Sequence, residues 1–144
     1  MLLAGAIGYD PTMQRRAMEF HDSRILSMRR DGADLRIRVS AYIHVSEGEP
    51  GRDAGTGWIQ EMDLVLSDVQ VHSAPAQETG DISTGRVRVG DRTLENELPL
   101  PFDHAGEVRL ELETLGGQLT VVATRLAALE IGEPRFVEDV PLLP

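Results

Sequence analysis

The sequence has no cysteine and no lysine, and aromatic residues make up only 4% of its 144 positions. Without cysteine the chain forms no disulfide, thiolate zinc site or cysteine nucleophile. It has 14 basic residues, all arginine, and 24 acidic residues, which gives a net charge of −10. Nucleic acids bind mainly through cationic contacts, so we expect no nucleic-acid partner. No apolar run reaches the roughly 18–20 residues of a membrane span, so we expect a cytoplasmic protein without a membrane partner.

The length suits one domain, large enough to bury a core without metal or disulfide support. We expect residues 1–17 to lie at the periphery and residues 18–144 to form the domain. Met13 and Met18 are alternatives to Met1 as the translation start, because Met18 directly precedes the first structured motif.

Apolar and polar residues alternate along much of the chain, which is typical of half-buried strands. The clearest case is 34–45, and 24–30 before it forms a second strand. Asp31-Gly32 between them predicts a hairpin turn, because both residue types tolerate positive φ. The apolar phase of 58–72 changes near Ser67-Asp68, which predicts a β-bulge there.

Further strands are expected later in the chain. They cover 82–89, 92–100, 107–113, 119–123 with its extension over 125–131, and 136–140. The fold we predict is all-β and mainly antiparallel, a two-layer β-sandwich of about seven strands, with room for one short N-terminal helix. An up-and-down barrel, or a sheet covered by a helix at 11–20, remain alternatives. Of the aromatic residues, Trp58, Phe20, Phe102 and Phe136 are expected in the core.

The sequence Phe20-His21-Asp22-Ser23 invites comparison with a hydrolase triad. Successive strand residues point to opposite faces, and the chain has no G-x-S-x-G elbow, so we do not predict catalysis here. We expect Phe20 to enter the core and His21 or Asp22 to hydrogen-bond at the strand entrance. Ligand binding by His21 and Asp22 is the alternative.

The polar face of the 34–45 strand is the second candidate binding surface. It carries Arg36, Arg38, Tyr42 and His44. These side chains can form a cationic patch for a carboxylate, a phosphate or an acidic partner surface. The alternative is a solvated face whose arginines pair across strands with Asp63, Glu111 or Glu113.

Metal and nucleotide sites lack their usual signatures. The histidines, His21, His44, His72 and His104, fall in separate segments without a short-spaced pair, so we expect no metal. Gly55-Thr56-Gly57 lacks the lysine of a P-loop, so we interpret it as a loop and expect no cofactor.

The segment from Phe20-His21-Asp22-Ser23 to Met28 resembles the first strand of a group of little-characterised bacterial proteins. Further similarities are the Trp58 strand, 64–69 and 132–138. Some members of the group are classed as immunity proteins that accompany polymorphic toxins. The resemblance implies a small β domain without established enzymatic activity, and it transfers no catalytic residue.

The leading hypothesis is therefore a non-enzymatic binding domain that sequesters a protein partner in the manner of an immunity protein. A small-molecule binder or hydrolase, with a pocket near His21, Asp22 and the face of the 34–45 strand, is the first alternative. The second is a structural subunit of a homo-oligomer that pairs through edge strands such as 136–140.

Overall fold

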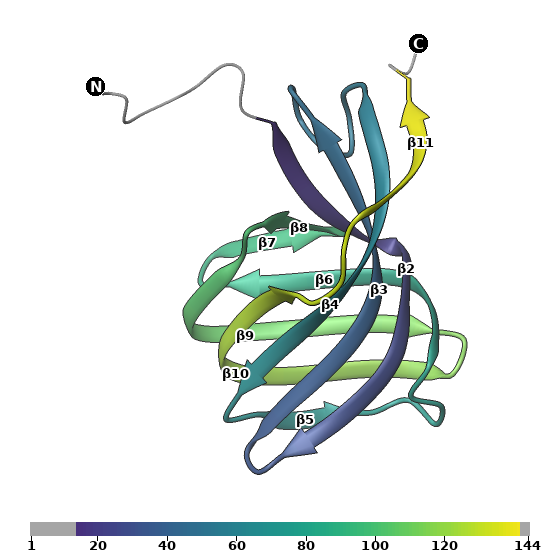
Figure 1. Cartoon of the computed structure of the whole chain (residues 1–144). Helices are drawn as coiled ribbons and strands as arrows, with labels where there is room; N and C mark the ends of the chain where they lie inside the picture. The colour runs from purple at the N-terminus through teal and green to yellow at the C-terminus, as the bar shows by residue number, and fades with distance from the viewer. Residues whose placement is uncertain (1–13, 142–144) are drawn as a thin grey trace.

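The computed structural model describes residues 14–141, which form an antiparallel all-β fold without helices in that range (Figure 1). The strands are β2 (Arg15–Asp31), β3 (Asp34–Ser46), β4 (Gly55–Ser67), β5 (Gln70–Ser73), β6 (Gly80–Val89), β7 (Arg92–Glu95), β8 (Glu97–Leu100), β9 (Asp103–Thr114), β10 (Gly117–Glu130) and β11 (Arg135–Val140). Over residues 14–141, accordingly, we find no helix with the length and apolar character needed to span a bilayer.

The sheet closes on itself, so the two-layer sandwich that we predicted is wrong. The strands β4, β3, β2, β6, β9 and β10 follow one another, and β10 pairs again with β4 to complete a six-stranded barrel within a ten-stranded sheet. β5, β7, β8 and β11 attach to β10, β6, β2 and β4 respectively. Closure buries one face of each of the six barrel strands, as a second layer would, and it leaves free edges only on attached strands among those described, such as β11.

Side chains from all six barrel strands fill the interior, as in other small barrels. The alternation in 34–45 is confirmed: Leu35, Ile37, Val39, Ala41 and Ile43 are all buried. Phe20 is fully buried as expected, and its burial anchors β2 between Glu19 and His21, two residues of the candidate site.

Of two local predictions, the hairpin is confirmed with a small shift and the bulge is not. The β2–β3 hairpin exists, but Asp31 pairs with Asp34, so Gly32 (φ 65°) and Ala33 form its turn. The bulge predicted near Ser67-Asp68 is replaced by a break between β4 and β5, where Asp68 has φ 49°. The register with β10 is the same before the break (Ser67 opposite Arg125) and after it (Gln70 opposite Val122), so no extra residue is inserted.

The expectation for the N-terminal segment is wrong from residue 15 onward. Arg15 begins β2 and pairs with Ser46, and Ala17 is buried between β3 and β8. Strand pairing on both sides therefore replaces the peripheral segment that we expected at residues 15–17, and no helix forms in the described residues where we had left room for one. Residues 1–13 of that prediction lie outside the described part of the chain.

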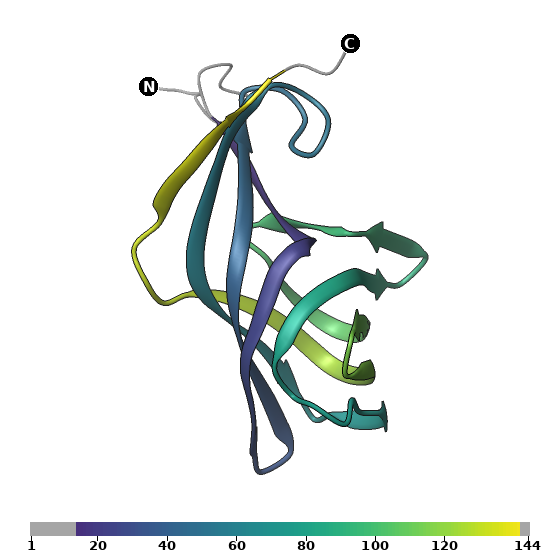
Figure 2. The same ribbon diagram turned by 90° about the vertical axis from the view of Figure 1, so that its right-hand side faces the viewer.

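Parts of β2, β3 and β4 extend beyond the barrel, and β11 lies beside them (Figures 1 and 2). Here Phe136 packs edge-on against Trp58, with ring centroids 5.5 Å apart, but half of its surface is exposed. Phe136 is therefore not a core residue, contrary to our expectation. This extension positions the candidate site.

Candidate functional site: an acidic cleft beside the bulge of β2

A wide bulge interrupts β2 at the Phe-His-Asp-Ser sequence. Glu19 pairs with Tyr42 and Arg24 with Ser40, so residues 20–23 all lie opposite the single residue Ala41. Such a bulge turns side chains out of their regular alternation. It therefore determines where the polar side chains of this sequence point.

The hydroxyl of Ser23 closes the bulge. It donates to the backbone carbonyl of Glu19 at 2.6 Å and accepts the backbone N–H of Tyr42 at 2.9 Å. Ser23 is buried, and its hydroxyl serves as a backbone partner where the β2–β3 ladder is broken. This geometry gives Ser23 a structural role and does not present it as a nucleophile.

Asn96, between β7 and β8, holds the other side of the bulge. It adopts positive φ (62°), its carbonyl accepts the N–H of Phe20 at 2.8 Å, and its Oδ1 accepts the N–H of His21 at 2.9 Å. Phe20 passes inward against Gly85, where an added Cβ would lie 2.4 Å from the Phe20 ring. The buried aromatic ring and the asparagine thus clamp the bulge from two sides.

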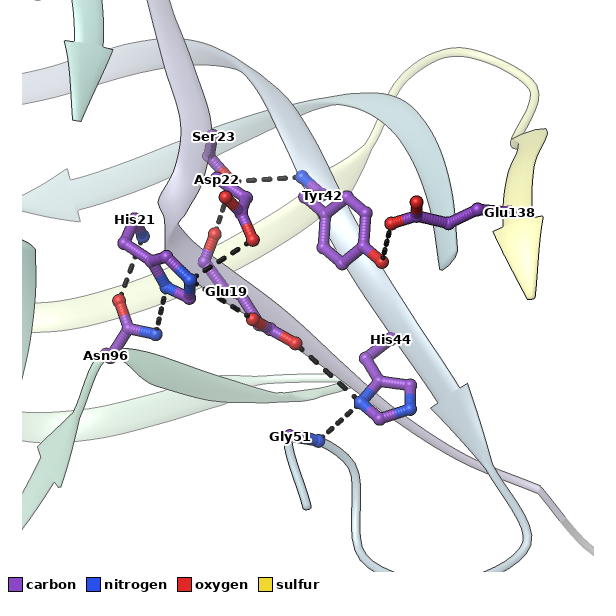
Figure 3. Close-up of polar contacts among 9 residues, drawn as sticks. All are labelled: Glu19, His21, Asp22, Ser23, Tyr42, His44, Gly51, Asn96 and Glu138. Carbon is purple, nitrogen blue, oxygen red and sulfur yellow. Dashed lines mark hydrogen bonds and ion pairs between the residues drawn. The ribbon is translucent and has the colours of Figure 1, made fainter. Parts of the chain in front are cut away.

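His21 and Asp22 lie together outside the barrel, contrary to our argument that adjacent strand residues separate. The bulge brings His21 Nε2 to 3.1 Å from Asp22 Oδ2 and 3.7 Å from Glu19 Oε1 (Figure 3). Because Asn96 Oδ1 already accepts a backbone N–H, its amide nitrogen donates to His21 Nδ1. Nε2 therefore carries a proton and faces the two carboxylates.

The ligand atoms of Glu19, His21 and Asp22 lie within 4.8 Å of one another, a spacing that fits a metal ion. A metal-bound histidine, however, usually donates its other ring N–H to a neighbouring acceptor. Here Asn96 offers a donor to that nitrogen. The hydrogen bonds thus suit a histidine that donates to carboxylates, and we assign no metal to this trio.

Tyr42 and His44 lie on the outer face of β3, and two glycines of β4 make room for their rings. A Cβ on Gly57 would lie 2.1 Å from the Tyr42 hydroxyl oxygen, and one on Gly55 would lie 2.9 Å from His44 Nε2. The Tyr42 ring can therefore extend toward β11, where its hydroxyl donates to Glu138 at 2.8 Å. Gly55-Thr56-Gly57 is thus the start of a strand and not the loop that we predicted.

His44 is buried, and its hydrogen bonds define its tautomer. The backbone N–H of Gly51 donates to Nδ1 at 2.5 Å, so the ring proton sits on Nε2. Nε2 has no hydrogen-bond partner in the described part of the chain. Glu19 Oε2 lies 3.7 Å from the same Nδ1.

A cleft of about 270 Å³ opens beside these residues. Its lining includes the carboxylates of Glu19, Asp22, Asp53, Glu138 and Asp139. Arg52 is the single lysine or arginine that lines it within residues 14–141. Negative charge therefore dominates the cleft.

Electrostatics within the cleft follow from burial and from like charges. Burial is the largest effect and raises the pKa of Glu19; His21 opposes it, and the nearby carboxylates of Asp22 and Glu138 raise that pKa further. Burial and the hydrogen bond to Glu138 raise the pKa of the Tyr42 hydroxyl. The ionised form of Glu19 is thus disfavoured in the free protein, and a nearby cation would stabilise it.

Arg36 and Arg38 lie elsewhere on the same strand face and do not join Tyr42 and His44 in a free cationic patch. Arg36 Nη1 donates to Asp63 Oδ2 at 2.8 Å, and Arg38 Nε donates to Asp63 Oδ1 at 2.5 Å. Burial alone would raise the pKa of Asp63, but hydrogen bonds from Arg38 and Arg36 outweigh it and lower that pKa. The alternative that we kept open, cross-strand pairing with Asp63, is what the structure shows.

The fold and the site together define a closed antiparallel β-barrel with an acidic cleft on its outer surface. No family model, curated protein or solved structure matches this chain. Sequence reasoning identified His21, Asp22, Tyr42 and His44, but it missed Glu19, Asn96 and Glu138. One signal was available: a Gly-x-Gly strand beside a Tyr-x-His strand leaves room for two rings.

Proposed function

We propose that this chain is a non-enzymatic binding domain whose acidic cleft receives a cationic side chain of a protein partner. One observation carries the proposal: five carboxylates line the cleft against one arginine. Ionised groups gathered in this way repel one another, and a guanidinium or ammonium group from outside relieves that repulsion.

The size and lining of the cleft favour a side chain over a bare ion. A space of about 270 Å³ is close to the lower limit of small-ligand pockets, which fits the end of one long side chain. Tyr42 supplies an aromatic ring, a group that attracts cations at its face, and Glu138 supplies a carboxylate for bidentate pairing with arginine. Arginine is also enriched among residues that dominate protein interfaces.

The partner class that we propose is a basic protein, and a toxin accompanied by an immunity protein is the case that the resemblance implies. A net charge of −10 would accelerate the approach of such a partner through long-range attraction. The hydrolase alternative has less support, because the Ser23 hydroxyl donates its proton to one backbone group and accepts a hydrogen bond from another.

The test uses Nα-acetyl-arginine amide, with Nα-acetyl-citrulline amide as an uncharged probe of nearly the same shape. Amide NMR shifts of Gly51 and Tyr42 report on binding, because both N–H groups hydrogen-bond at the cleft. We expect the arginine probe to bind with about millimolar affinity and citrulline at least about tenfold more weakly.

Variants separate the cleft from the general acidity of the protein. Glu19→Gln and Glu138→Gln should each weaken binding of the arginine probe, whereas Glu107→Gln, a matched change on β9, should not. Equal binding of citrulline and arginine, or equal affinity of all three variants, would overturn the proposal.

A further inference from the structure

We infer that the partner presents its cationic residue on an extended segment that adds as a strand to the free edge of β11, with basic and apolar side chains in alternation. This inference rests on the proposed function and specifies how the partner binds. β11 ends the strand order of the sheet and pairs only with β4 among the described strands. Sheet edges of this kind accept extended peptides through main-chain hydrogen bonds.

A bulge gives β11 two chemically different sides. Phe136 pairs with Trp58 and Glu138 with Gly57, so Val137 lies between them without a partner in the register. Because of this extra residue, Phe136 and Glu138 face opposite sides of the sheet. Glu138 contacts Tyr42 at the acidic cleft, and Phe136 contacts Trp58 on the other side.

The side of the sheet that carries Trp58 offers apolar contacts within a mixed surface. A groove of about 360 Å³ lies there, lined by Ile43, Val45, Trp58 and Pro134 together with four polar residues, Gln14, Arg16, Thr56 and Gln60. Phe136 and Val137 of β11 are about half exposed. An added strand would therefore meet carboxylates on one side, and on the other the rings of Trp58 and Phe136 with aliphatic and polar groups around them.

The alternation of side chains along a strand determines which sequence pattern would fit the β11 edge. Successive side chains point to opposite faces, so a segment paired with β11 would direct every second residue toward the cleft. Lysine or arginine at those positions would meet Glu138, and the intervening residues, if apolar, would meet Phe136 and Trp58. Charge complementarity and apolar burial then favour the same pattern.

A second copy of this chain fits the edge poorly. Self-pairing would bring the Glu138 and Asp139 carboxylates of two chains together, and each chain carries a net charge of −10. Charged residues on edge strands normally prevent such self-pairing. The same charges attract a basic strand of another protein.

Two hexapeptides of equal composition test the inference. One alternates arginine and valine, and the other places three arginines before three valines; both have blocked ends. Trp58 is the only tryptophan, so its fluorescence reports directly on the β11 edge. We expect the alternating peptide to bind about tenfold more tightly than the block peptide, a difference of about 1.4 kcal/mol.

Substitutions in β11 separate strand addition from cation binding. Phe136→Ala should weaken the alternating peptide severalfold and leave binding of Nα-acetyl-arginine amide unchanged, whereas Glu138→Gln should weaken both. Phe136→Leu should retain most of the peptide affinity, and unfolding curves verify that each variant is folded.

The outcomes distinguish the two proposals. Equal binding of both peptides, with the arginine probe still bound, would overturn strand addition and leave the proposed function intact. A self-associated protein with β11 at its dimer interface, shown by light scattering and relieved by Phe136→Ala, would also overturn it. Failure of both peptides and of the arginine probe would overturn the proposed function itself.

Discussion

The outer face of β3 carries two ionic clusters that differ in how their charge is balanced. Arg36 and Arg38 both donate to the buried carboxylate of Asp63, so two cations surround one anion. Further along the strand, Tyr42 and His44 border a cleft in which carboxylates far outnumber cations. Both clusters use the same strand and the same face.

The comparison separates structural charge from charge that is available for binding. In the Asp63 cluster, hydrogen bonds within the chain satisfy the buried carboxylate, and the pKa of Asp63 is lowered despite its burial. In the cleft, the pKa of Glu19 is raised, because burial and neighbouring carboxylates disfavour its ionised form. Only the second cluster gains from an external cation.

The largest expected effect comes from breaking the balanced cluster. Asp63→Asn should destabilise the fold by about 2–3 kcal/mol at pH 7, less than for a fully buried pair because the arginines are partly exposed to solvent. The pKa of Asp63 is lowered in the folded state, so its contribution is present above about pH 4 and disappears as the pH falls through the folded value. Urea unfolding of the wild type and of Asp63→Asn at pH 7 and at pH 3 measures this difference in stability.

The matched control for this change is Glu61→Gln, because Glu61 is exposed and lies 3.8 Å from Arg38. It should change stability by less than about 0.5 kcal/mol. A control as damaging as Asp63→Asn would contradict the structural role assigned to Asp63.

A smaller loss is expected where the bulge is held closed. Ser23→Ala removes the donor to the Glu19 carbonyl and leaves the Tyr42 N–H buried without its acceptor, at a cost of about 1–3 kcal/mol. Because Glu19, His21 and Asp22 would shift, the arginine probe should also bind more weakly. Ser27→Ala, an exposed change on the same strand, should leave both unfolding midpoint and probe affinity unchanged.

A third change tests the position of the Tyr42 ring. Gly57→Ala would place a Cβ 2.1 Å from the Tyr42 hydroxyl oxygen, so the ring must move and release Glu138. We expect a loss of about 1–2 kcal/mol and weaker binding of the arginine probe. Gly132→Ala is the control, because its nearest contact would be an ordinary 3.6 Å. A crystal structure of Gly57→Ala with the Tyr42–Glu138 hydrogen bond intact would contradict this account.

The strands were predictable because alternation is a local property of the sequence. The buried face from Leu35 to Ile43 and the β2–β3 hairpin follow from neighbouring residues alone. The barrel was not predictable, because a sandwich and a barrel demand the same alternation. They differ here in the pairing of β10 with β4, which joins Arg125 to Ser67 and continues to Glu130 and Met62.

The candidate site was predictable only in part for the same reason. Tyr42 and His44 could be placed on one face from their spacing, but the Tyr42–Glu138 contact spans 96 positions of the chain. His21 and Asp22 were identified, yet their shared orientation depends on a bulge that Ser23 and Asn96 stabilise from two directions. Local sequence patterns do not show which distant residues will contact one another in the fold.

The stability of Glu19→Gln tests most directly the claim that the negative charge of the cleft is not balanced within the chain. Glu19 has a raised pKa in the fold, so its ionised form opposes folding increasingly as the pH rises from about 4.3 through the folded value. We therefore expect Glu19→Gln to be more stable than the wild type at pH 7 by up to about 1 kcal/mol, with the gain absent below pH 4. A loss of stability at pH 7, as for Asp63→Asn, would contradict the account.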